Sequence, residues 1–235
     1  MPIRINKYLA GCGVASRRTI DKLIAEKRIA INGVVLQKPG SLVEEGDSVT
    51  VDGKQIEGQS KNGITILLNK PTGCITTSSD PQKRKTVLDY VQCGVRVFPI
   101  GRLDKDTTGV LLLTNDGELA HMLMHPRYSV EKIYQAHLDK PFIEAHKKRF
   151  ESGVVLDDKK TTPCHTRFVG NSERNVVITL HEGRNRQIHR MFKSLGYVVE
   201  KLERTSYASL TTHELKQGEW RYLTRKEVER LYGKC

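Results

Sequence analysis

A cluster of charged side chains precedes an apolar strand in the segment FPIGRLDKDTTGVLLLTNDG, which runs from Phe98 to Gly117. Arg102, Asp104 and Asp106 lie in a glycine-bounded loop directly before the run VLLL. A tight turn has a use for one aspartate, but not for this concentration of charge. A carboxylate kept ionised beside a cation can act as a nucleophile or a base without a metal or a cofactor. The loop is therefore the first candidate for a catalytic site.

Other familiar catalytic sites are missing from the sequence. It has no Gly-x-x-x-x-Gly-Lys-Ser/Thr loop, no Gly-x-Gly-x-x-Gly fingerprint and no Gly-x-Ser-x-Gly elbow. His121 and His125 are four residues apart on an expected helix, but the glutamate of a zinc-protease motif does not accompany them. The five cysteines are odd in number and lack zinc-ligand spacing, which is typical of free thiols in a reducing compartment. We therefore expect no metal and no cofactor.

The balance of charge favours a polyanionic partner. The chain carries 39 Lys and Arg against 27 Asp and Glu, a net charge of +12. Nucleic acid is the commonest partner of such a protein, although a solvated basic surface is the simpler alternative. No apolar stretch reaches the length of a membrane helix, and the N-terminus MPIRINKYLA lacks the apolar core of a signal peptide. We expect a cytoplasmic protein with no membrane partner.

The elements that must position the acidic loop divide into two expected domains. Residues 1–58 predict two short helices followed by a hairpin, because Ser16 is a good N-cap and Asn32-Gly33 is a hairpin turn. Residues 59–63 are polar and end in glycine, which indicates a linker. Residues 64–235 alternate strands with short helices, which predicts an α+β domain. The first domain is then expected to be a small α/β domain of the size of an RNA-binding domain.

Basic charge in the first domain is confined to its helical half. Residues 1–28 hold seven basic and two acidic side chains, whereas residues 29–58 hold two basic and five acidic ones. Arg17 and Arg18 follow the N-cap Ser16, where the helix dipole disfavours cations. A bound phosphate would explain this placement, since it would contact free N–H groups and both guanidiniums. Two solvated arginines are the alternative.

A helix with a basic side is expected in the segment EGRNRQIHRMFKSLG. Its apolar residues recur at helical spacing, and Gly196 is a natural end. The apolar stripe consists of Ile188, Met191, Phe192 and Leu195, and the neighbouring basic face of Arg186, His189, Arg190 and Lys193. This helix could form one wall of an RNA groove, or its charges could be solvated.

Four motifs together resemble one known family. The segment GRLDKDTTGVLLLTNDG is similar to the catalytic motif of the pseudouridine synthases that modify ribosomal RNA, the RsuA, RluB and RluF relatives. LNKPTG, EKIY and EGRNRQIHRM resemble three further motifs of this family, in the same order. RINKYLA and SRR resemble the RNA-binding domain named for a small-subunit ribosomal protein. The resemblance covers the whole chain and implies a mixed, largely antiparallel catalytic sheet.

The resemblance implies roles for individual residues. Asp104 matches the nucleophilic aspartate, Arg102 the arginine that helps to flip the target base, and Tyr134 the tyrosine that stacks on the uracil. Asp106 is expected to fix the loop. The residues expected to bind RNA are Arg4, Lys7, Arg17, Arg18, Lys22, Lys70, Arg184, Arg186 and Arg190. The implied reaction breaks the bond from ribose to the ring nitrogen of uridine and remakes it to ring carbon five, without a cofactor.

One position departs from the family pattern. His189 stands at a position where most members of the family resemble an Arg or Lys pattern. In that pattern the cation pairs with the catalytic aspartate. A histidine can replace that cation only while it is protonated. The hypothesis is that Asp104 holds His189 protonated, or that Arg186 or Arg190 takes over the role.

The substrate and the assembly state are left more open. KLERTSYASL and GEWRYLT resemble relatives that modify the large subunit, so we expect a uridine of large-subunit ribosomal RNA, free or in a pre-ribosomal particle. Small-subunit RNA and transfer RNA are alternatives, as is a non-catalytic RNA-binding ribosome-assembly factor. A nucleotide-transfer enzyme lacks the phosphate loop it would need. We expect a monomer.

Overall fold

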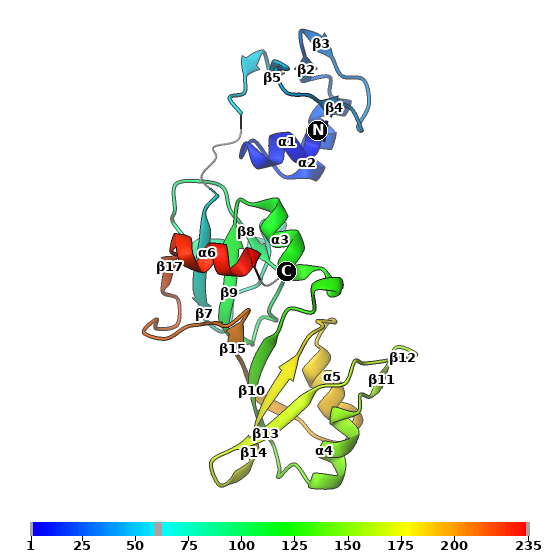
Figure 1. The fold of residues 1–235 in the computed structure, drawn as a ribbon, viewed down its shortest axis with the longest axis vertical. Helices are drawn as coiled ribbons and strands as arrows, with labels where there is room; N and C mark the ends of the chain where they lie inside the picture. The colour runs from blue at the N-terminus through cyan, green and yellow to red at the C-terminus, as the bar shows by residue number, and fades with distance from the viewer. Residues whose placement is uncertain (1, 59–62, 234–235) are drawn as a thin grey trace. The chain divides into compact units, whose positions relative to one another are not determined.

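The computed structural model describes residues 2–58 and 63–233, and these form two compact units (Figure 1). The first consists of Met1–Ile64, Gly94–Val97 and Asn115–Gly117. The second consists of Thr65–Cys93, Phe98–Thr114 and Glu118–Cys235. Residues 59–62 of the expected linker lie outside the described residues, and the expected domain boundaries stay a prediction.

The first unit packs two helices against short antiparallel strands. The elements are β1 (Ile3–Arg4), α1 (Ile5–Gly11), α2 (Arg17–Ala25), β2 (Ile29–Ile31), β3 (Val34–Val35), β4 (Leu42–Val43), β5 (Val49–Val51) and β6 (Lys54–Gln55). β1 pairs with β4, and β3-β2-β5-β6 form a sheet of four strands. Ile5, Leu9, Ile20, Ile24 and Ile29 are fully buried and lead the core of this unit.

Local sequence signals in this unit form the expected structures. The Ser16 hydroxyl accepts a hydrogen bond of 3.1 Å from the Thr19 amide, which caps α2. Asn32 and Gly33 join β2 to β3 with φ of 51° and 78°, the left-handed values that a tight hairpin turn requires. Both predictions are confirmed.

The second unit is built on a sheet of nine strands. Its main path runs β13-β14-β10-β15-β9-β7-β17, while β16 pairs with β15 and β8 with β9. The strands are β7 (Thr65–Lys70), β8 (Phe98–Ile100), β9 (Thr108–Thr114), β10 (Lys132–Leu138), β13 (His165–Val169), β14 (Ser172–Leu180), β15 (Val199–Tyr207), β16 (Leu210–Thr211) and β17 (Trp220–Tyr222). All pairs are antiparallel except β9 with β15. The predicted mixed, largely antiparallel α+β fold is confirmed.

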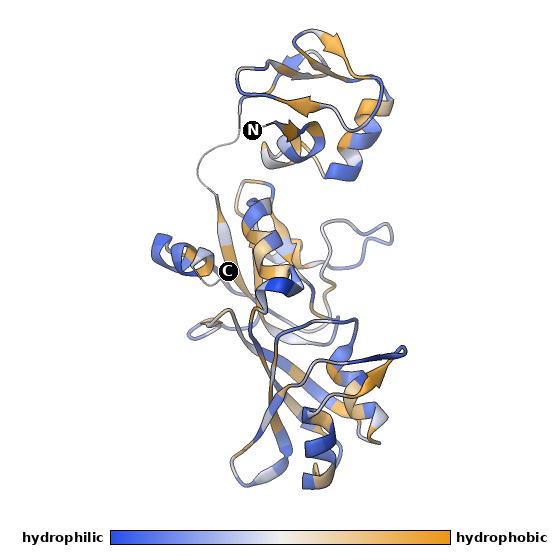
Figure 2. Ribbon diagram, turned by 45° about the vertical axis from the view of Figure 1, so that its right-hand side comes forward, coloured by the Kyte–Doolittle hydropathy of each residue, from blue (hydrophilic) through white to orange (hydrophobic). Residues whose placement is uncertain are grey.

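Helices cover this sheet as two neighbouring groups, each with its own core. They are η1 (Val87–Tyr90), α3 (Gly117–Met124), η2 (Pro126–Tyr128), α4 (Glu144–Glu151), α5 (Gln187–Ser194) and α6 (Arg225–Tyr232), and a hairpin of β11 (Val155–Leu156) and β12 (Lys159–Lys160) follows α4. α4 and α5 pack on β10 and β14, whereas α3 and α6 pack on β7 and β9. The hydropathy colouring shows apolar and polar residues mixed along these helices, as amphipathic helices require (Figure 2).

The ends of two helices reflect local sequence. Thr224 and Glu227 form the predicted capping box at the start of α6. α5 begins only at Gln187, because Arg186 adopts a left-handed φ of 46°. The sequence had suggested that Arg186 belongs to the helix, and this is wrong. Ile188, Met191 and Phe192 are buried as expected. None of the helices in the described part of the chain has the length and apolar character needed to cross a membrane.

Candidate active site

A cleft of about 530 Å³ opens in the second unit. The apolar core beneath α3 and α6 contributes Leu123, Val130 and Tyr207 to its lining. The apolar core beneath α4 and α5 contributes Leu180 and Ile188. The cleft thus lies where the two groups of helices on the sheet diverge. Its volume falls within the range typical of small-molecule and nucleotide sites.

The cleft brings together the residues expected to act in catalysis. Arg102 and Asp104 line it from the loop before β9, Tyr134 from β10, and His189 from α5. Asp106 lies in the same loop but is exposed and does not line the cleft. These side chains come from three separate segments of the sequence, so the fold and not local spacing assembles them.

The loop that carries Asp104 is fixed by side chains from β7 and the turn after it. The Thr76 hydroxyl donates to the Leu103 carbonyl over 2.8 Å and accepts from the Leu103 amide over 3.2 Å. The Gly73 amide donates to the Lys105 carbonyl over 3.0 Å. Backbone and side-chain hydrogen bonds therefore hold the loop on both sides of Asp104.

Lys70 belongs to this support and does not lie on an RNA-facing surface, where the sequence had suggested it. Its side chain is 0% exposed, and its ammonium donates to the carbonyls of Pro71, Lys105 and Thr107 over 3.0, 3.2 and 2.9 Å. Burial lowers the pKa of Lys70, while Cys74, Asp106 and Asp104 oppose this effect. All three ammonium protons are used, so Lys70 connects the end of β7 to the loop that carries Asp104.

Arg204 is a cleft residue that the sequence analysis missed. It is 2% exposed, and its guanidinium contacts both cleft tyrosines, 4.6 Å from the Tyr207 ring and 6.0 Å from the Tyr134 ring. One N–H donates to the Val110 carbonyl over 2.8 Å and another to the Tyr134 hydroxyl over 3.5 Å. The signal was present in LERTS, since strand alternation places Arg204 on the same buried side as Leu202.

Three polar atoms of the cleft lack a protein partner. Within the described residues, no hydrogen bond reaches Arg204 Nη2, Thr107 Oγ1 or His189 Nδ1, although all three atoms are buried. Thr107, like Arg204, is only 2% exposed. Buried polar groups are normally satisfied, so this set of atoms indicates a polar ligand.

A second cation, Lys132, lies beside Arg204 on the floor of the cleft. Its ammonium donates to the Val130 carbonyl over 2.8 Å and lies 5.5 Å from the centre of the Tyr207 ring. Burial, and then repulsion from Arg204, lowers the pKa of Lys132 to about 8. Its charge therefore changes close to physiological pH.

The structure changes the interpretation of His189. Burial is the main cause that lowers its pKa, and repulsion from Arg186 adds to it. Asp104 and Asp106 oppose this shift but do not reverse it. The lowered pKa of His189 disfavours the hypothesis that Asp104 holds it protonated, and the role of His189 stays a prediction.

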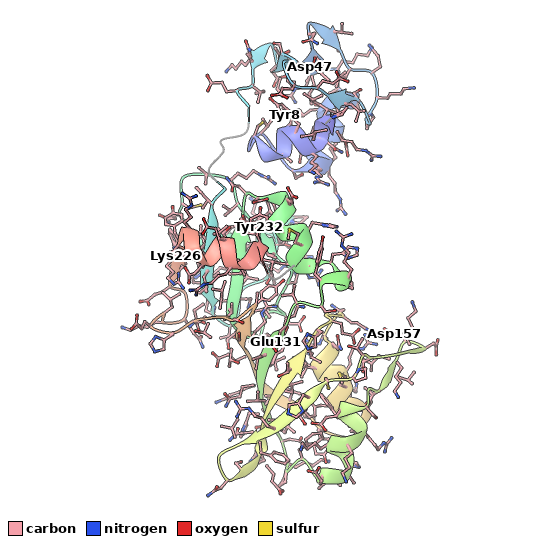
Figure 3. All side chains as sticks on the ribbon, viewed as in Figure 1. Tyr8, Asp47, Glu131, Asp157, Lys226 and Tyr232 are labelled. Atoms are coloured by element: carbon pink, nitrogen blue, oxygen red, sulfur yellow. The ribbon has the colours of Figure 1, made fainter. Side chains whose placement is uncertain are left out.

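The basic residues around α5 divide by their contacts. Arg190 does not line the cleft. Its guanidinium pairs over 2.6 Å with Asp157, which Figure 3 labels in the β11–β12 turn. Arg184 lines the cleft but donates to the carbonyls of Lys159 and Lys160 over 2.9 and 2.7 Å. Arg186 lines the cleft and is exposed. Of the three, Arg186 is best placed to contact RNA.

The expected RNA-binding residues of the first unit are all exposed. They are Arg4 of β1, Lys7 of α1, and Arg17, Arg18 and Lys22 of α2. None of them forms an ion pair with another residue that the structure describes. The first turn of α2 contains no acidic residue. These cations are consequently available to phosphates, and their role in RNA binding stays a prediction.

Comparisons with known proteins show the family to which the chain belongs. Residues 64–194 match the family model of RNA pseudouridylate synthase, and residues 3–49 match the S4 domain. The chain is 40% identical over 233 residues to "Ribosomal large subunit pseudouridine synthase B" of Bacillus subtilis (strain 168), which covers 97% of this chain and 95% of that protein. It is 38% identical over 233 residues to "Dual-specificity RNA pseudouridine synthase RluF" of Escherichia coli (strain K12), with 98% and 78% covered.

A solved structure gives the same result. The protein described as "Crystal structure of pseudouridylate synthase" superposes with a TM-score of 0.71 at 29% identity, covering 97% of this chain and 99% of that one. The resemblance inferred from the motifs is thereby confirmed over the whole length. The chain belongs to the RNA pseudouridylate synthase family and carries an S4 domain in its N-terminal part.

Proposed function

We propose that this pseudouridine synthase isomerises a uridine of ribosomal RNA, preferentially of the large subunit, and that Asp104 begins the reaction. The observation that carries the proposal is a single cleft that holds Asp104, Tyr134 and the partly unpartnered guanidinium of Arg204. The name of the Bacillus subtilis relative supports the large subunit. The Escherichia coli relative is named dual-specificity, so small-subunit RNA or transfer RNA is the alternative substrate.

The target uridine must leave its stack to reach the cleft. Flipping a nucleotide costs a few kcal/mol. Stacking on the Tyr134 ring offsets about 1–3 kcal/mol of that cost. Arg102 is exposed beside Asp104 and is placed to contact the strand that the base has left. The Thr107 hydroxyl and the His189 ring nitrogen, which have no partner among the described residues, then meet the polar edge of the base.

Asp104 then acts on the ribose. Its carboxylate either attacks the anomeric carbon or removes a proton from the neighbouring ribose carbon, and the family resemblance favours the second route. In both routes the bond from the anomeric carbon to N1 breaks and its electron pair leaves with the uracil. The ring rotates, and C5 bonds to the anomeric carbon as the bond from Asp104 to that carbon breaks, or as Asp104 returns its proton to the neighbouring ribose carbon. C5 then loses its proton and N1 gains one, so no electrons are exchanged with a cofactor.

Arg204 supplies the positive charge that an ionised Asp104 needs in a desolvated cleft. It is buried in the same cleft, and its Nη2 has no partner among the described residues. Burial and Arg186 lower the pKa of His189, and Arg190 is held by Asp157, so both are weaker candidates than Arg204 for this role. A guanidinium keeps its charge at every pH at which RNA is stable.

The proposal is tested by mapping pseudouridine in all ribosomal and transfer RNAs of the source strain. The gene is deleted and then restored as the parent, as Asp104→Asn or as Asp106→Asn. We expect one site to disappear and to return with the parent and with Asp106→Asn. Asp104→Asn should lower the rate on purified RNA by at least roughly 10³-fold. Asp106→Asn is a matched control, because the same change occurs in the same loop outside the cleft.

Binding separates catalysis from simple RNA recognition. Asp104→Asn should bind RNA at least as tightly as the parent, because it removes a negative charge and keeps the shape. A map in which every site persists after deletion would contradict the proposed function. A site that returns with Asp104→Asn would contradict the role of Asp104.

A further inference from the structure

Lys132 is a cleft cation that the reaction described so far does not use. It precedes Tyr134 by two residues on β10, so both side chains point to the same face of the sheet. Figure 3 labels its neighbour Glu131, whose carbonyl accepts from the Ala208 amide over 3.0 Å and fixes the start of the strand. Lys132 and Tyr134 both line the cleft.

The surroundings of Lys132 give its charge no carboxylate partner. Arg204 and Tyr207 face it from β15, and Arg204 is a like charge. His181 and Glu182 follow β14, where the His181 ring bonds the Ser129 carbonyl over 2.8 Å and Glu182 binds Arg184 and Gln187. No described acidic side chain lies within 4.0 Å of its ammonium. Arg204 is buried and Lys132 is half-buried, and these two neighbouring cations together form a site for an anion.

The ammonium also has unused hydrogen-bonding capacity. Of its three N–H groups, one donates to the Val130 carbonyl. Arg204, by contrast, already uses two of its nitrogens on Val110 and Tyr134, and the proposed function assigns Nη2 to Asp104. Lys132 is thus the cleft cation that is left for the substrate.

The isomerisation creates such an anion. When the bond from N1 to the anomeric carbon breaks, the electron pair stays on N1 and is delocalised onto O2 and O4. A half turn about the N3–C6 axis exchanges N1 with C5 and also O2 with O4. One fixed donor on that side of the ring therefore meets a carbonyl oxygen both before and after the rotation.

We propose that Lys132 is a catalytic residue that donates a hydrogen bond from its ammonium to a carbonyl oxygen of the detached uracil anion. This inference rests on the proposed function and adds to it the group that stabilises the leaving base. The proton count is unchanged, because Lys132 stays protonated throughout. The C5 proton leaves after the new bond forms, and N1 gains a proton.

The charge of Lys132 gives the proposal a pH signature. The activity requires the protonated form, and the pKa of Lys132 is lowered to about 8 by burial and by Arg204. The ratio kcat/KM reports groups of the free enzyme, so it should fall as pH rises through about 8. A neutral lysine acting as a base would give the opposite result, a rise through the same range.

The first experiment compares pH profiles on a short RNA that carries the mapped site. Lys132→Met should lower kcat by roughly 10²-fold, the usual effect of removing one donor to a developing anion, and should lack the alkaline limb. Lys132→Arg stays charged and should keep more activity than Lys132→Met without that limb. Lys201→Met is the matched control, because Lys201 is exposed on β15 and does not line the cleft. Ionisation of the RNA affects all four proteins alike.

The second experiment changes the leaving group. The same RNA is transcribed with 5-fluorouridine, and single-turnover breakage of the N1 bond is followed by nucleoside chromatography. Fluorine stabilises the uracil anion by itself, so the loss caused by Lys132→Met should be several-fold smaller on this RNA. A merely structural role of Lys132 would reduce both rates by the same factor.

Three results would overturn the proposal. The first is activity of Lys132→Met equal to that of the parent. The second is a kcat/KM of the parent that rises or stays level as pH rises through about 8. The third is an equal loss of rate from Lys132→Met on the uridine and the 5-fluorouridine RNA. If circular dichroism shows that Lys132→Met does not fold, the proposal is tested by the pH dependence of kcat/KM of the parent and of Lys132→Arg. An inactive parent would instead refute the proposed function, so the two failures are distinguishable.

Discussion

Replacing Lys70 with methionine should separate the support of the catalytic loop from its chemistry. The change keeps an unbranched apolar stem of similar length and removes only the ammonium. That ammonium is fully buried and donates three hydrogen bonds of 2.9–3.2 Å, two of them to the loop around Asp104. The methionine leaves the carbonyls of Pro71, Lys105 and Thr107 without this donor.

The magnitude follows from two opposed contributions. Each hydrogen bond from a charged group is worth about 1.5–3 kcal/mol, but transferring the ammonium from water costs several kcal/mol, which the variant recovers. Breaking a buried charged network by removing one partner typically costs about 3–5 kcal/mol. We expect that loss in the free energy of unfolding of the second unit. At about 2–4 °C per kcal/mol, the midpoint of thermal unfolding falls by roughly 6–20 °C.

Three quantities are measured: the free energy of unfolding, the hydrogen-exchange protection of the loop and the rate constant kcat. Hydrogen exchange of the Thr107 amide, which donates to the Asp104 carbonyl over 3.1 Å, should accelerate more than exchange in the sheet. The rate constant kcat should fall by about 10²-fold well below the midpoint, as small misplacements of a catalytic group do. Lys201→Met should change stability by less than about 0.5 kcal/mol. If Lys70→Met loses stability but keeps kcat and the protection of Thr107, Lys70 does not position Asp104.

Three further predictions concern other parts of the chain. Gly109→Ala should lower the free energy of unfolding in urea by about 2–4 kcal/mol, because Gly109 has φ of 100° and a Cβ there would collide with the Arg204 carbonyl. Replacing a glycine with alanine in an open turn, where only backbone strain acts, costs about 1–2 kcal/mol. A loss at Gly109 no larger than that would refute the close-contact argument. Glu227→Gln should cost about 1 kcal/mol at neutral pH, because hydrogen bonds from Arg221 lower the pKa of Glu227 to about 2. That contribution is present above the unfolded value of 4.5 and is lost as pH falls through about 2, so the parent and variant unfolding curves should converge in acid. Arg17→Ala with Arg18→Ala should reduce the salt slope of RNA binding by about 0.7 per lost phosphate contact and leave kcat at saturating RNA unchanged; an unchanged slope would remove both from the interface.

Local features of the fold could be predicted because their causes lie within a few residues. The Ser16 cap, the Asn32-Gly33 turn and the Thr224 capping box each depend on backbone geometry over about four positions, and all three are present. The apolar stripe of α5 was predictable for the same reason. Its start was not, because the sequence does not reveal that Arg186 takes a left-handed conformation.

The burial of Lys70 and the partners of Arg204 were beyond this kind of inference, because the groups that surround them come from distant segments. A lysine at the end of a strand is expected at the surface, since buried lysines are rare unless their charge is compensated. Two of the carbonyls that compensate Lys70 lie 35 and 37 residues away in the sequence. The Val110 carbonyl that fixes Arg204 is 94 residues away. Composition and periodicity carry no information about such pairings.

The position of Arg204 itself depends on a glycine. β9 and β15 are parallel neighbours only at Thr108 with Glu203 and Gly109 with Arg204. The missing side chain of Gly109 permits this approach, which in turn lets the Arg204 guanidinium reach the Val110 carbonyl and the cleft. Gly109, which follows the loop of Asp104, thus sets the distance between β9 and β15, the strand that carries the proposed cation Arg204. We therefore expect the conformation of Gly109 to matter to the proposed reaction as well as to folding, although its own atoms do no chemistry.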